Sequence, residues 1–119
     1  MRLKNRLTKP YQFLKVRQIG RSYNNNLLLL YALPNDLPIS RFGFVVNKRM
    51  GNAIIRNRIK RWLREASRIL LKDIALGWDL VLVVKKETRN RDFTAIKDSL
   101  EDLIKKIGLL KINVKIGTE

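Results

Sequence analysis

The sequence contains no cysteine and no histidine, and these absences exclude several kinds of site. Without cysteine there are no disulfide bonds and no thiolate metal sites. Without histidine the chain lacks the most common general acid or base and the most common transition-metal ligand. Acidic residues are also few, ten against 26 lysines and arginines, and they are scattered along the chain. We therefore expect no catalytic residue on this chain.

Two groups of acidic residues are candidates for a catalytic site. Asp98, Glu101 and Asp102 lie close together in the sequence, but helical spacing places them on an exposed face, where solvated charge is the simpler interpretation. Asp79 and Glu87 flank a predicted strand and suggest a metal-dependent nuclease, but no second carboxylate with metal-ligand spacing accompanies them. A phosphate-binding glycine loop is absent as well. We predict no metal and no firmly bound cofactor on this chain.

Long apolar runs are missing too. None approaches the length of a membrane span, and residues 1–15 contain no apolar signal core, so the expected compartment is the cytoplasm. The 119 residues, 45% of them apolar, suit a single folded domain over residues 1–119. Residues 1–7 form a basic N-terminal arm. The tail, residues 109–119, alternates apolar and polar residues, which leaves open whether it adds an edge strand or stays mobile.

Positive charge is the most prominent feature that is present. The formal net charge is +16, and the sequence pI is about 10.9. Residues 1–72 hold 17 basic residues against two acids, whereas residues 73–119 hold nine against eight. Such a clustered basic excess is typical of proteins that bind nucleic acid.

The hydrophobic pattern predicts an alternation of helices and strands. We expect a helix from a Thr8 cap to about Gln18, a strand over 27–33, the second half of a hairpin over 41–47, a helix from an Asn52 cap to about residues 72–76, a strand over 78–85 and a helix over 92–107 ended by Gly108. An additional short strand over 22–26 is an open alternative. The order predicts an α+β two-layer sandwich, a sheet of about four strands with three helices covering one side.

The helix after Asn52 combines an apolar stripe with a dense array of cations. Ile59 and Leu63 fall on one side of the helical wheel, whereas Arg56, Lys60 and Arg64 recur at four-residue spacing on the other. Residues 48–68 hold eight basic residues and one acid. Exposed helices usually mix charges of both signs, so this bias favours a polyanionic partner, RNA or DNA, over a merely solvated face.

The same segment resembles a known signature. Lys48, Gly51-Asn52-Ala53, Arg56-Asn57-Arg58, Lys60-Arg61 and Arg64-Glu65 together are similar to the RNR motif of the bacterial ribonuclease P protein family. Arg6-Leu7, Phe13, Gly20, Tyr31, Gly43 and the strand that begins at Asp79 extend the resemblance over roughly residues 5–108.

The resemblance carries expectations beyond the residue pattern. It implies a mixed sheet with a left-handed β-α-β crossover, although parallel crossovers are usually right-handed. It implies two partners, a catalytic ribonuclease P RNA and precursor tRNA, from which the complex removes the 5′ leader. It also implies that Mg2+, bound mainly by the RNA subunit, supports the chemistry. No membrane or protein partner is expected.

The resemblance also assigns two sets of site residues. The set that binds the RNA subunit is Lys48, Arg49, Asn52, Arg56, Asn57, Arg58, Lys60, Arg61, Arg64 and Arg68. The set that lines a cleft for the precursor tRNA leader, between the first helix and the sheet, is Phe13, Arg17, Tyr31, Val45, Asn47 and Lys86. Family members often carry a second aromatic residue at the position of Arg17 and small hydroxyl residues at those of Val45 and Asn47. We therefore expect leader contacts here to depend more on charge and less on stacking.

Two other functions remain open from the residues themselves. A structural RNA-binding protein of the ribosomal type would have a similar charge and fold, and only the RNR signature separates it from a ribonuclease P subunit. A self-sufficient nuclease would require cleavage by the protein without RNA.

Overall fold

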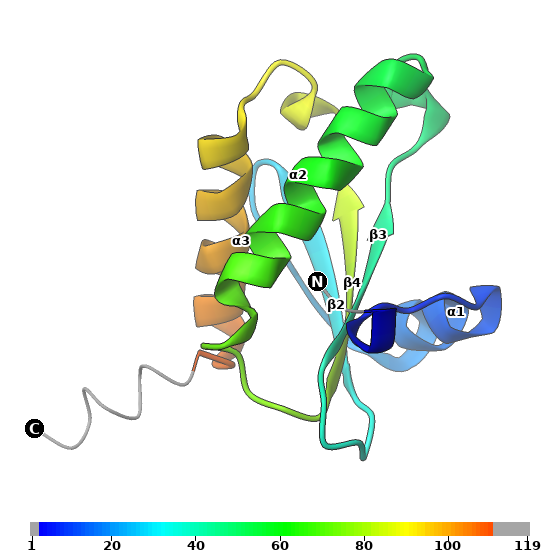
Figure 1. Cartoon of the computed structure of the whole chain (residues 1–119), viewed down its shortest axis with the longest axis vertical. Coiled ribbons are helices and arrows are strands. Elements are labelled where there is room, and N and C mark those ends of the chain that lie inside the picture. Colours follow the sequence, from blue (N-terminus) through cyan, green and yellow to red (C-terminus); the bar gives the residue numbers. More distant parts are fainter. Residues whose placement is uncertain (1–2, 111–119) are drawn as a thin grey trace, which may run out of the picture.

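The computed structural model describes residues 3–110, which form three α-helices, four strands and three short 3-10 helices (Figure 1). In chain order they are η1 (Leu3–Asn5), α1 (Pro10–Ile19), β1 (Arg21–Asn24), β2 (Leu28–Pro34), β3 (Arg41–Val45), η2 (Lys48–Met50), α2 (Ala53–Leu71), β4 (Trp78–Val84), η3 (Lys86–Thr88) and α3 (Phe93–Ile107). The short strand left open by the sequence is present as β1. Among the described residues, no helix is both long and apolar enough to cross a membrane.

The strands form one mixed sheet in the order β1-β2-β4-β3. β4 lies antiparallel to β2 and parallel to β3, so β2 and β3 are not neighbours and the predicted hairpin between them is wrong. The physical reason lies in the strands' composition. β4 is apolar after Asp79 and buried along nearly its whole length, as suits a central strand. β3 carries Arg41 and Gly43 and occupies the edge.

The connection from β3 through α2 to β4 joins two parallel neighbouring strands. Seen from the side of α2, the chain passes from β3 to β4 leftward with the strands pointing up, so this crossover is left-handed (Figure 1). The mixed four-stranded sheet with three helices confirms the predicted fold class, and the handedness is the one that the resemblance implies.

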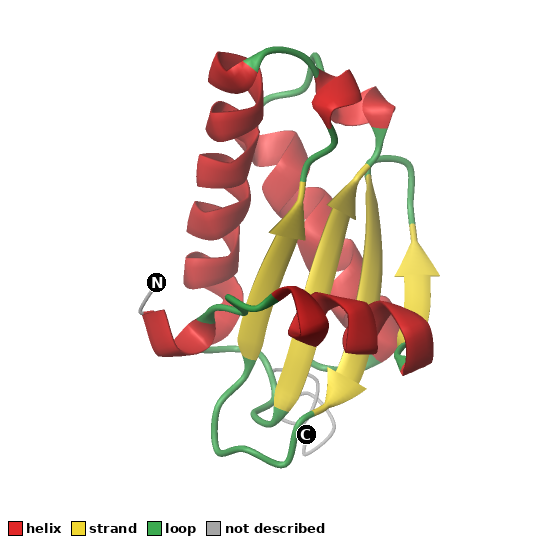
Figure 2. Cartoon of the chain, turned by 90° about the vertical axis from the view of Figure 1, so that its right-hand side faces the viewer, coloured by secondary structure: helices red, strands yellow, loops and turns green. Residues whose placement is uncertain are grey.

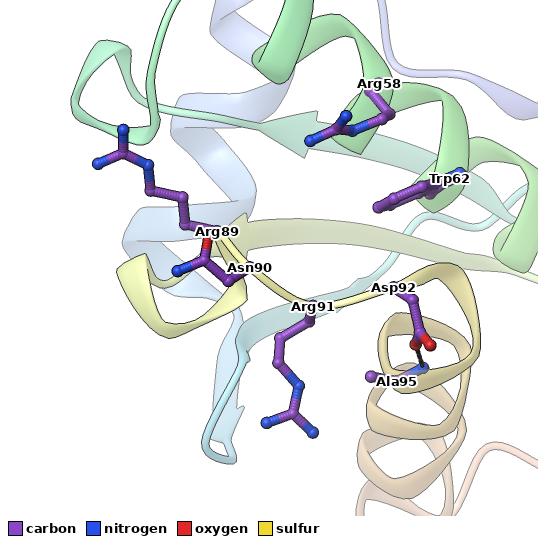
Figure 3. A pocket seen from close by; sticks show the side chains of 7 residues that line it. All are labelled: Arg58, Trp62, Arg89, Asn90, Arg91, Asp92 and Ala95. Atoms are coloured by element: carbon purple, nitrogen blue, oxygen red, sulfur yellow. Dashed lines mark hydrogen bonds between the residues drawn. The ribbon is translucent and has the colours of Figure 1, made fainter.

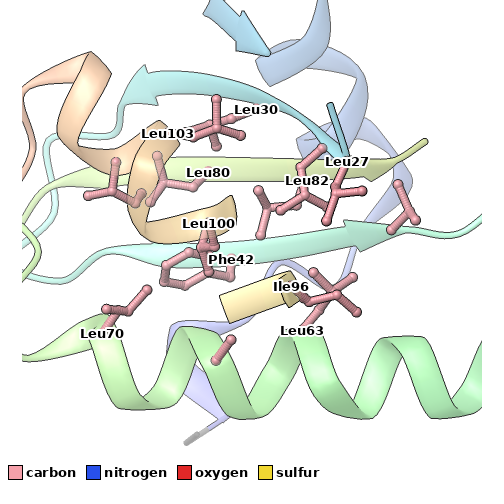
Figure 4. Close-up of a cluster of buried hydrophobic side chains, with 14 of the residues drawn as sticks. Leu27, Leu30, Phe42, Leu63, Leu70, Leu80, Leu82, Ile96, Leu100 and Leu103 are labelled. Atoms are coloured by element: carbon pink, nitrogen blue, oxygen red, sulfur yellow. The ribbon is translucent and has the colours of Figure 1, made fainter. Parts of the chain in front are cut away.

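The main core lies between the sheet and the pair α2 and α3, which pack against each other. Its fully buried side chains come from both layers (Figure 4). They include Leu28, Leu30, Phe42, Leu80 and Leu82 of the sheet, with Ile59, Leu63, Ile96, Leu100, Leu103 and Ile104 of the helices. Burial of this apolar surface on one stripe leaves the opposite side of α2 free for charged residues.

The opposite face of the sheet carries α1 (Figure 2). Val16 of α1 and Val81 of β4 are buried there together with Leu7, and this smaller cluster corrects the expectation that all helices cover one side. The segment predicted as a basic arm also packs closely. The Asn5 amide donates to the Ser40 carbonyl oxygen at 2.9 Å, and the Leu7 amide donates to the Phe42 carbonyl oxygen.

The start of α2 and both ends of α3 lie at the residues expected from the sequence, whereas the start of α1 does not. The side chain of Asn52 accepts a hydrogen bond from the Ile55 amide at 3.0 Å, and Asp92 does the same at the start of α3. Gly108 ends α3 in the left-handed conformation at φ 81°. Thr8 is not the cap of α1, because Lys9 holds that position and the Gln12 side chain accepts the backbone N–H groups of both residues.

The expected tail falls mostly outside the described residues. Leu109 and Leu110 are buried, and Leu110 forms an isolated antiparallel bridge with Ile74. Residues 111–119, on which the choice between an edge strand and a mobile tail depends, lie outside the description.

Candidate nucleic-acid interface

The basic residues predicted to bind RNA gather on α2 and on η2 before it. We call this set the basic surface; it comprises Lys48, Arg49, Asn52, Arg56, Asn57, Arg58, Lys60, Arg61, Arg64 and Arg68. Seven of the ten are exposed, and Arg56, Lys60 and Arg64 are half-buried. The stripe of Ile59 and Leu63 that fixes the helix against the sheet faces away from them, at 1% and 0% exposure. The sequence pattern therefore placed most of this surface correctly.

Local contacts hold the start of the basic surface. Gly51 has a φ of 140°, which L side chains rarely adopt, and the chain turns there from η2 into α2. The Arg56 Nε donates to the Gly51 carbonyl oxygen at 3.1 Å, which ties the side chain back to that turn. Asn52 uses its side-chain oxygen as the helix cap, so its contribution to binding is mainly to position the helix start.

Two other arginines of the basic surface, Arg64 and Arg68, differ in their hydrogen-bond partners. Arg68 pairs with Glu65, its Nε donating to Oε2 at 3.1 Å, and this hydrogen bond lowers the pKa of the Glu65 carboxyl below its ordinary value. Part of the Arg68 charge is thus already compensated. Arg64, one turn earlier, has a buried Nε with no hydrogen-bond acceptor in the described part of the chain.

Arg58 points away from the rest of the basic surface. Its guanidinium carbon lies 5.3 Å from the centre of the Trp62 ring, a cation–π distance. Both side chains line a hollow of about 540 Å³ with residues 89–92, which lead into α3, and with Ala95 in the first turn of α3 (Figure 3).

The sequence analysis does not find Arg89 and Arg91, because they lie in the connection between the strand predicted over 78–85 and the helix predicted over 92–107. Two arginines two residues apart are a signal for an anion site in the sequence. Their position beside α2, however, results from the packing of α3 on α2, which the sequence pattern does not give.

Five of the six residues predicted for the leader cleft line two hollows, and the sixth, Tyr31, lines neither but lies against Arg17. The first hollow, about 510 Å³, lies between α1 and the sheet and is lined by Phe13, Arg17 and Val45 among others. Arg17 places its guanidinium carbon 5.7 Å from the centre of the Tyr31 ring. This cation–π pair offers a charged, planar group beside an aromatic ring.

Phe13 rests directly on Gly43 of β3. A Cβ at position 43 would lie 2.4 Å from the Phe13 ring, so the glycine makes room for the aromatic side chain. The ring therefore lies close against the sheet and is half-buried.

The second hollow, about 350 Å³, lies beyond the carboxyl ends of β3 and β4. Its lining includes Asn47, Arg49 and Lys86. Arg49 belongs to the basic surface, so this hollow joins the basic surface to the region of the leader residues. Position 47 carries an amide and position 86 an ammonium group, both exposed and both able to donate to phosphate or sugar oxygens.

Asp79, one of the two carboxylates considered as metal ligands, is engaged elsewhere. Asp79 accepts two hydrogen bonds from the Arg41 guanidinium, each 2.8 Å, and one from the Asn35 amide at 2.8 Å. The hydrogen bond to Asp79 raises the pKa of Arg41. Within residues 3–110, no group of three or more Asp or Glu side chains gathers closely enough to hold a metal ion.

Comparison with known proteins gives consistent matches. The family model "Ribonuclease P" matches residues 1–108. A ribonuclease P protein component of Clostridium botulinum is 37% identical over 106 residues, which cover 88% of this chain and 96% of the relative. That of Roseiflexus castenholzii is 49% identical over 80 residues, 67% of this chain and 66% of the relative.

Solved structures agree with the sequence matches. The Staphylococcus aureus RNase P protein superposes with a TM-score of 0.83 at 28% identity, over 89% of this chain and 97% of that one. The Thermotoga maritima RNase P protein gives a TM-score of 0.79 at 31% identity, over 85% and 96%.

Proposed function

This chain belongs to the ribonuclease P protein family, and from that membership we propose that it is the protein subunit of a ribonuclease P that removes the 5′ leader from precursor tRNA. The observation that carries the proposal is the RNR motif displayed on one side of a helix whose other side is fixed in the core. The motif thus stands where a large RNA can reach it.

The basic surface is the part that binds the RNA subunit. Its guanidinium groups suit bidentate contacts with phosphate, and the i, i+4 spacing of Arg56, Lys60 and Arg64 sets three cations in a row along the helix. Because these like charges repel one another in the free protein, a bound polyanion relieves the repulsion. The unpartnered Nε of Arg64 would gain an acceptor at the same time.

The two hollows described above would hold the leader. Phe13 and the Arg17–Tyr31 pair offer flat surfaces to unpaired bases, and Asn47, Arg49 and Lys86 offer donors to the backbone. A single strand that follows this path would run from α1 across the carboxyl end of β3 to the basic surface. Arg49 would then contact RNA at the junction of the two regions.

Catalysis resides on the RNA subunit in this proposal, and so does the Mg2+ that supports it. The acids of this chain that have partners are used for structure, as in the pair of Asp79 with Arg41 and that of Glu65 with Arg68. The contribution of the protein is electrostatic. By placing cations between two polyanions it lowers their mutual repulsion and with it the Mg2+ concentration required. The cytoplasm, where tRNA precursors are made in bacteria, is the proposed location.

Reconstitution tests the proposal. The protein is mixed with a bacterial ribonuclease P RNA and a precursor tRNA at low Mg2+, and release of the 5′ leader is followed. We expect cleavage when both components are present, and little with either alone.

Each alternative outcome has a distinct meaning. Cleavage by the protein alone would reveal a nuclease site on this chain. Tight RNA binding without any stimulation, tested with several bacterial ribonuclease P RNAs, would favour a structural RNA-binding protein instead.

A further inference from the structure

The hollow between α2 and the start of α3 shares Arg58 with the basic surface, but its other lining residues belong to neither surface assigned above. Its lining combines Arg58 and Trp62 of α2 with Arg89, Arg91 and Asp92 before α3 (Figure 3). We propose that this hollow is an additional RNA site that takes one unpaired nucleotide, with its base against Trp62 and Arg58 and the neighbouring backbone phosphates beside Arg89 and Arg91 at the rim. The inference rests on the proposed function because it takes RNA as the partner.

Charge is the first argument. The lining holds three guanidinium groups and one carboxylate, that of Asp92, and so carries a net charge of +2. The guanidinium groups lie apart from one another around the hollow (Figure 3). Asp92 accepts from the Ala95 amide at 2.9 Å as the cap of α3. None of the ion pairs found within residues 3–110 involves Arg58, Arg89 or Arg91. Three cations around one hollow with a single carboxylate favour an anionic ligand.

The aromatic side chain is the second argument. Trp62 is half-buried, so part of its ring is fixed against the core while the rest faces the hollow. Stacking on an immobile ring costs little side-chain entropy, and arginine planes stack on bases as well as on indole. An acidic peptide would use the charges but not this combination of planar groups, and for that reason the occupant is a nucleotide.

Continuity is the third argument. Arg58 is part of the RNR motif, and its neighbours Asn57 and Arg61 belong to the exposed basic surface on the same helix. An RNA bound along α2 therefore passes beside the hollow. Arg89 and Arg91 extend the contact from α2 to the segment before α3, two elements that are distant in the sequence but adjacent in the fold.

The test removes the two loop arginines. Arg89→Ala/Arg91→Ala is compared with a matched double variant, Lys72→Ala/Lys105→Ala, which loses the same charge at exposed positions outside the hollow. Both are measured for binding to a bacterial ribonuclease P RNA over a range of KCl concentrations. We expect the loop variant to bind at least about tenfold more weakly, and the slope of log affinity against log salt to fall by about 1.4 to 1.8. The control should keep the wild-type slope.

Tryptophan fluorescence supplies a second readout. Trp78→Phe leaves Trp62 as the one tryptophan, because the sequence has two. We expect saturating RNA to quench Trp62 in this background and the quench to be lost when Arg89→Ala/Arg91→Ala is added. Thermal unfolding verifies that both double variants are folded, since Arg89 and Arg91 are exposed.

The possible failures are distinguishable. If the loop variant matches the control in affinity, slope and quench, the hollow is not an RNA site, while the proposed function stands. If the wild-type protein itself neither binds the RNA nor stimulates cleavage, the proposed function fails and this inference fails with it. If the loop variant loses binding to polyglutamate but keeps wild-type RNA affinity, the hollow belongs to an acidic protein segment instead.

Discussion

Phe13 owes its place over the sheet to the absence of a side chain at position 43. The ring and the glycine come from elements 30 residues apart, yet a single added carbon would overlap the ring. One residue without a side chain thus sets the depth of the first hollow. The proposed leader site and the packing of α1 are coupled at this point.

Gly43→Ala should destabilise the protein by about 1–3 kcal/mol, because the new methyl group displaces the ring. Leader affinity should fall as well, since Phe13 lines the hollow. Urea unfolding and binding of a leader-bearing precursor tRNA measure the two effects. In a Phe13→Ala background the same substitution should cost close to nothing. An equal loss in both backgrounds would show that the ring is not the cause.

Ile59→Ala should destabilise the protein by about 2–5 kcal/mol, because it leaves a cavity in the main core. Ile59 is 1% exposed. Ile54, in the first turn of the same helix, is 76% exposed and provides the matched control. Ile54→Ala should change the free energy of unfolding by no more than about 0.5 kcal/mol. A neutral Ile59→Ala would mean that the buried stripe of α2 has been assigned to the wrong residues.

At the scale of single elements, Asn25 connects the β1–β2 turn to α3. Its side-chain amide donates to the Ser99 carbonyl oxygen at 2.8 Å and to the Asp102 carboxylate at 3.1 Å. Its side-chain oxygen accepts from the Leu27 and Leu28 amides within the turn. These hydrogen bonds hold the β1–β2 hairpin against α3, although the two elements are far apart in the sequence.

This connection predicts a pH dependence. The hydrogen bond from Asn25, aided by Lys106, lowers the pKa of Asp102 below its ordinary value of 3.8. A folded-state pKa below the unfolded one stabilises the protein above the unfolded pKa, and this contribution is lost as the pH falls through the folded pKa. Asp102 is exposed, so the effect is small.

Urea midpoints measured from pH 6 to pH 2 should therefore fall less in Asp102→Asn than in the wild type. Asp98→Asn, on the same helix and exposed, is the control and should follow the wild type. If Asp102→Asn and the wild type lose stability in parallel, the carboxylate contributes nothing through this bond.

The elements themselves were largely predictable, because periodicity and capping are local properties. Asn52, Asp92 and Gly108 mark helix ends in the sequence as they do in the structure. The order of the strands was not predictable in this way. The short turn between residues 34 and 38 favours pairing of β2 with β3. The apolar strand β4 buries more surface when it lies between them, and the packing of the whole core decides in favour of that order.

At the scale of the whole molecule, the basic surface and the hollows differ in how far the sequence predicts them. Helical spacing alone placed the basic surface, since one helix carries most of it. The leader residues were divided between two hollows, and Arg89 and Arg91 were missed, because both facts depend on which loops the tertiary packing brings together. Sites within one element can be predicted from the sequence more readily than sites between elements.

The net charge of +16 predicts a steep dependence of RNA binding on salt. If six to ten phosphates are neutralised, affinity for ribonuclease P RNA should fall by about 10³–10⁵ between 50 and 200 mM KCl. Filter binding over that range measures it. The free energy of unfolding of the free protein, measured in parallel, should stay level or rise, because salt screens the repulsion among its own cations. An affinity loss below tenfold would mean that apolar contacts dominate.

The central position of β4 also has a consequence for biosynthesis. β4 pairs with both β2 and β3, yet it is encoded after them, at residues 78–84. A ribosome that has released the first 72 residues has therefore exposed 17 of the 26 basic side chains without the strand that completes the sheet. The nascent chain is a polycation next to ribosomal RNA before it is a folded protein. Its folding must be largely post-translational or begin in the last third of synthesis.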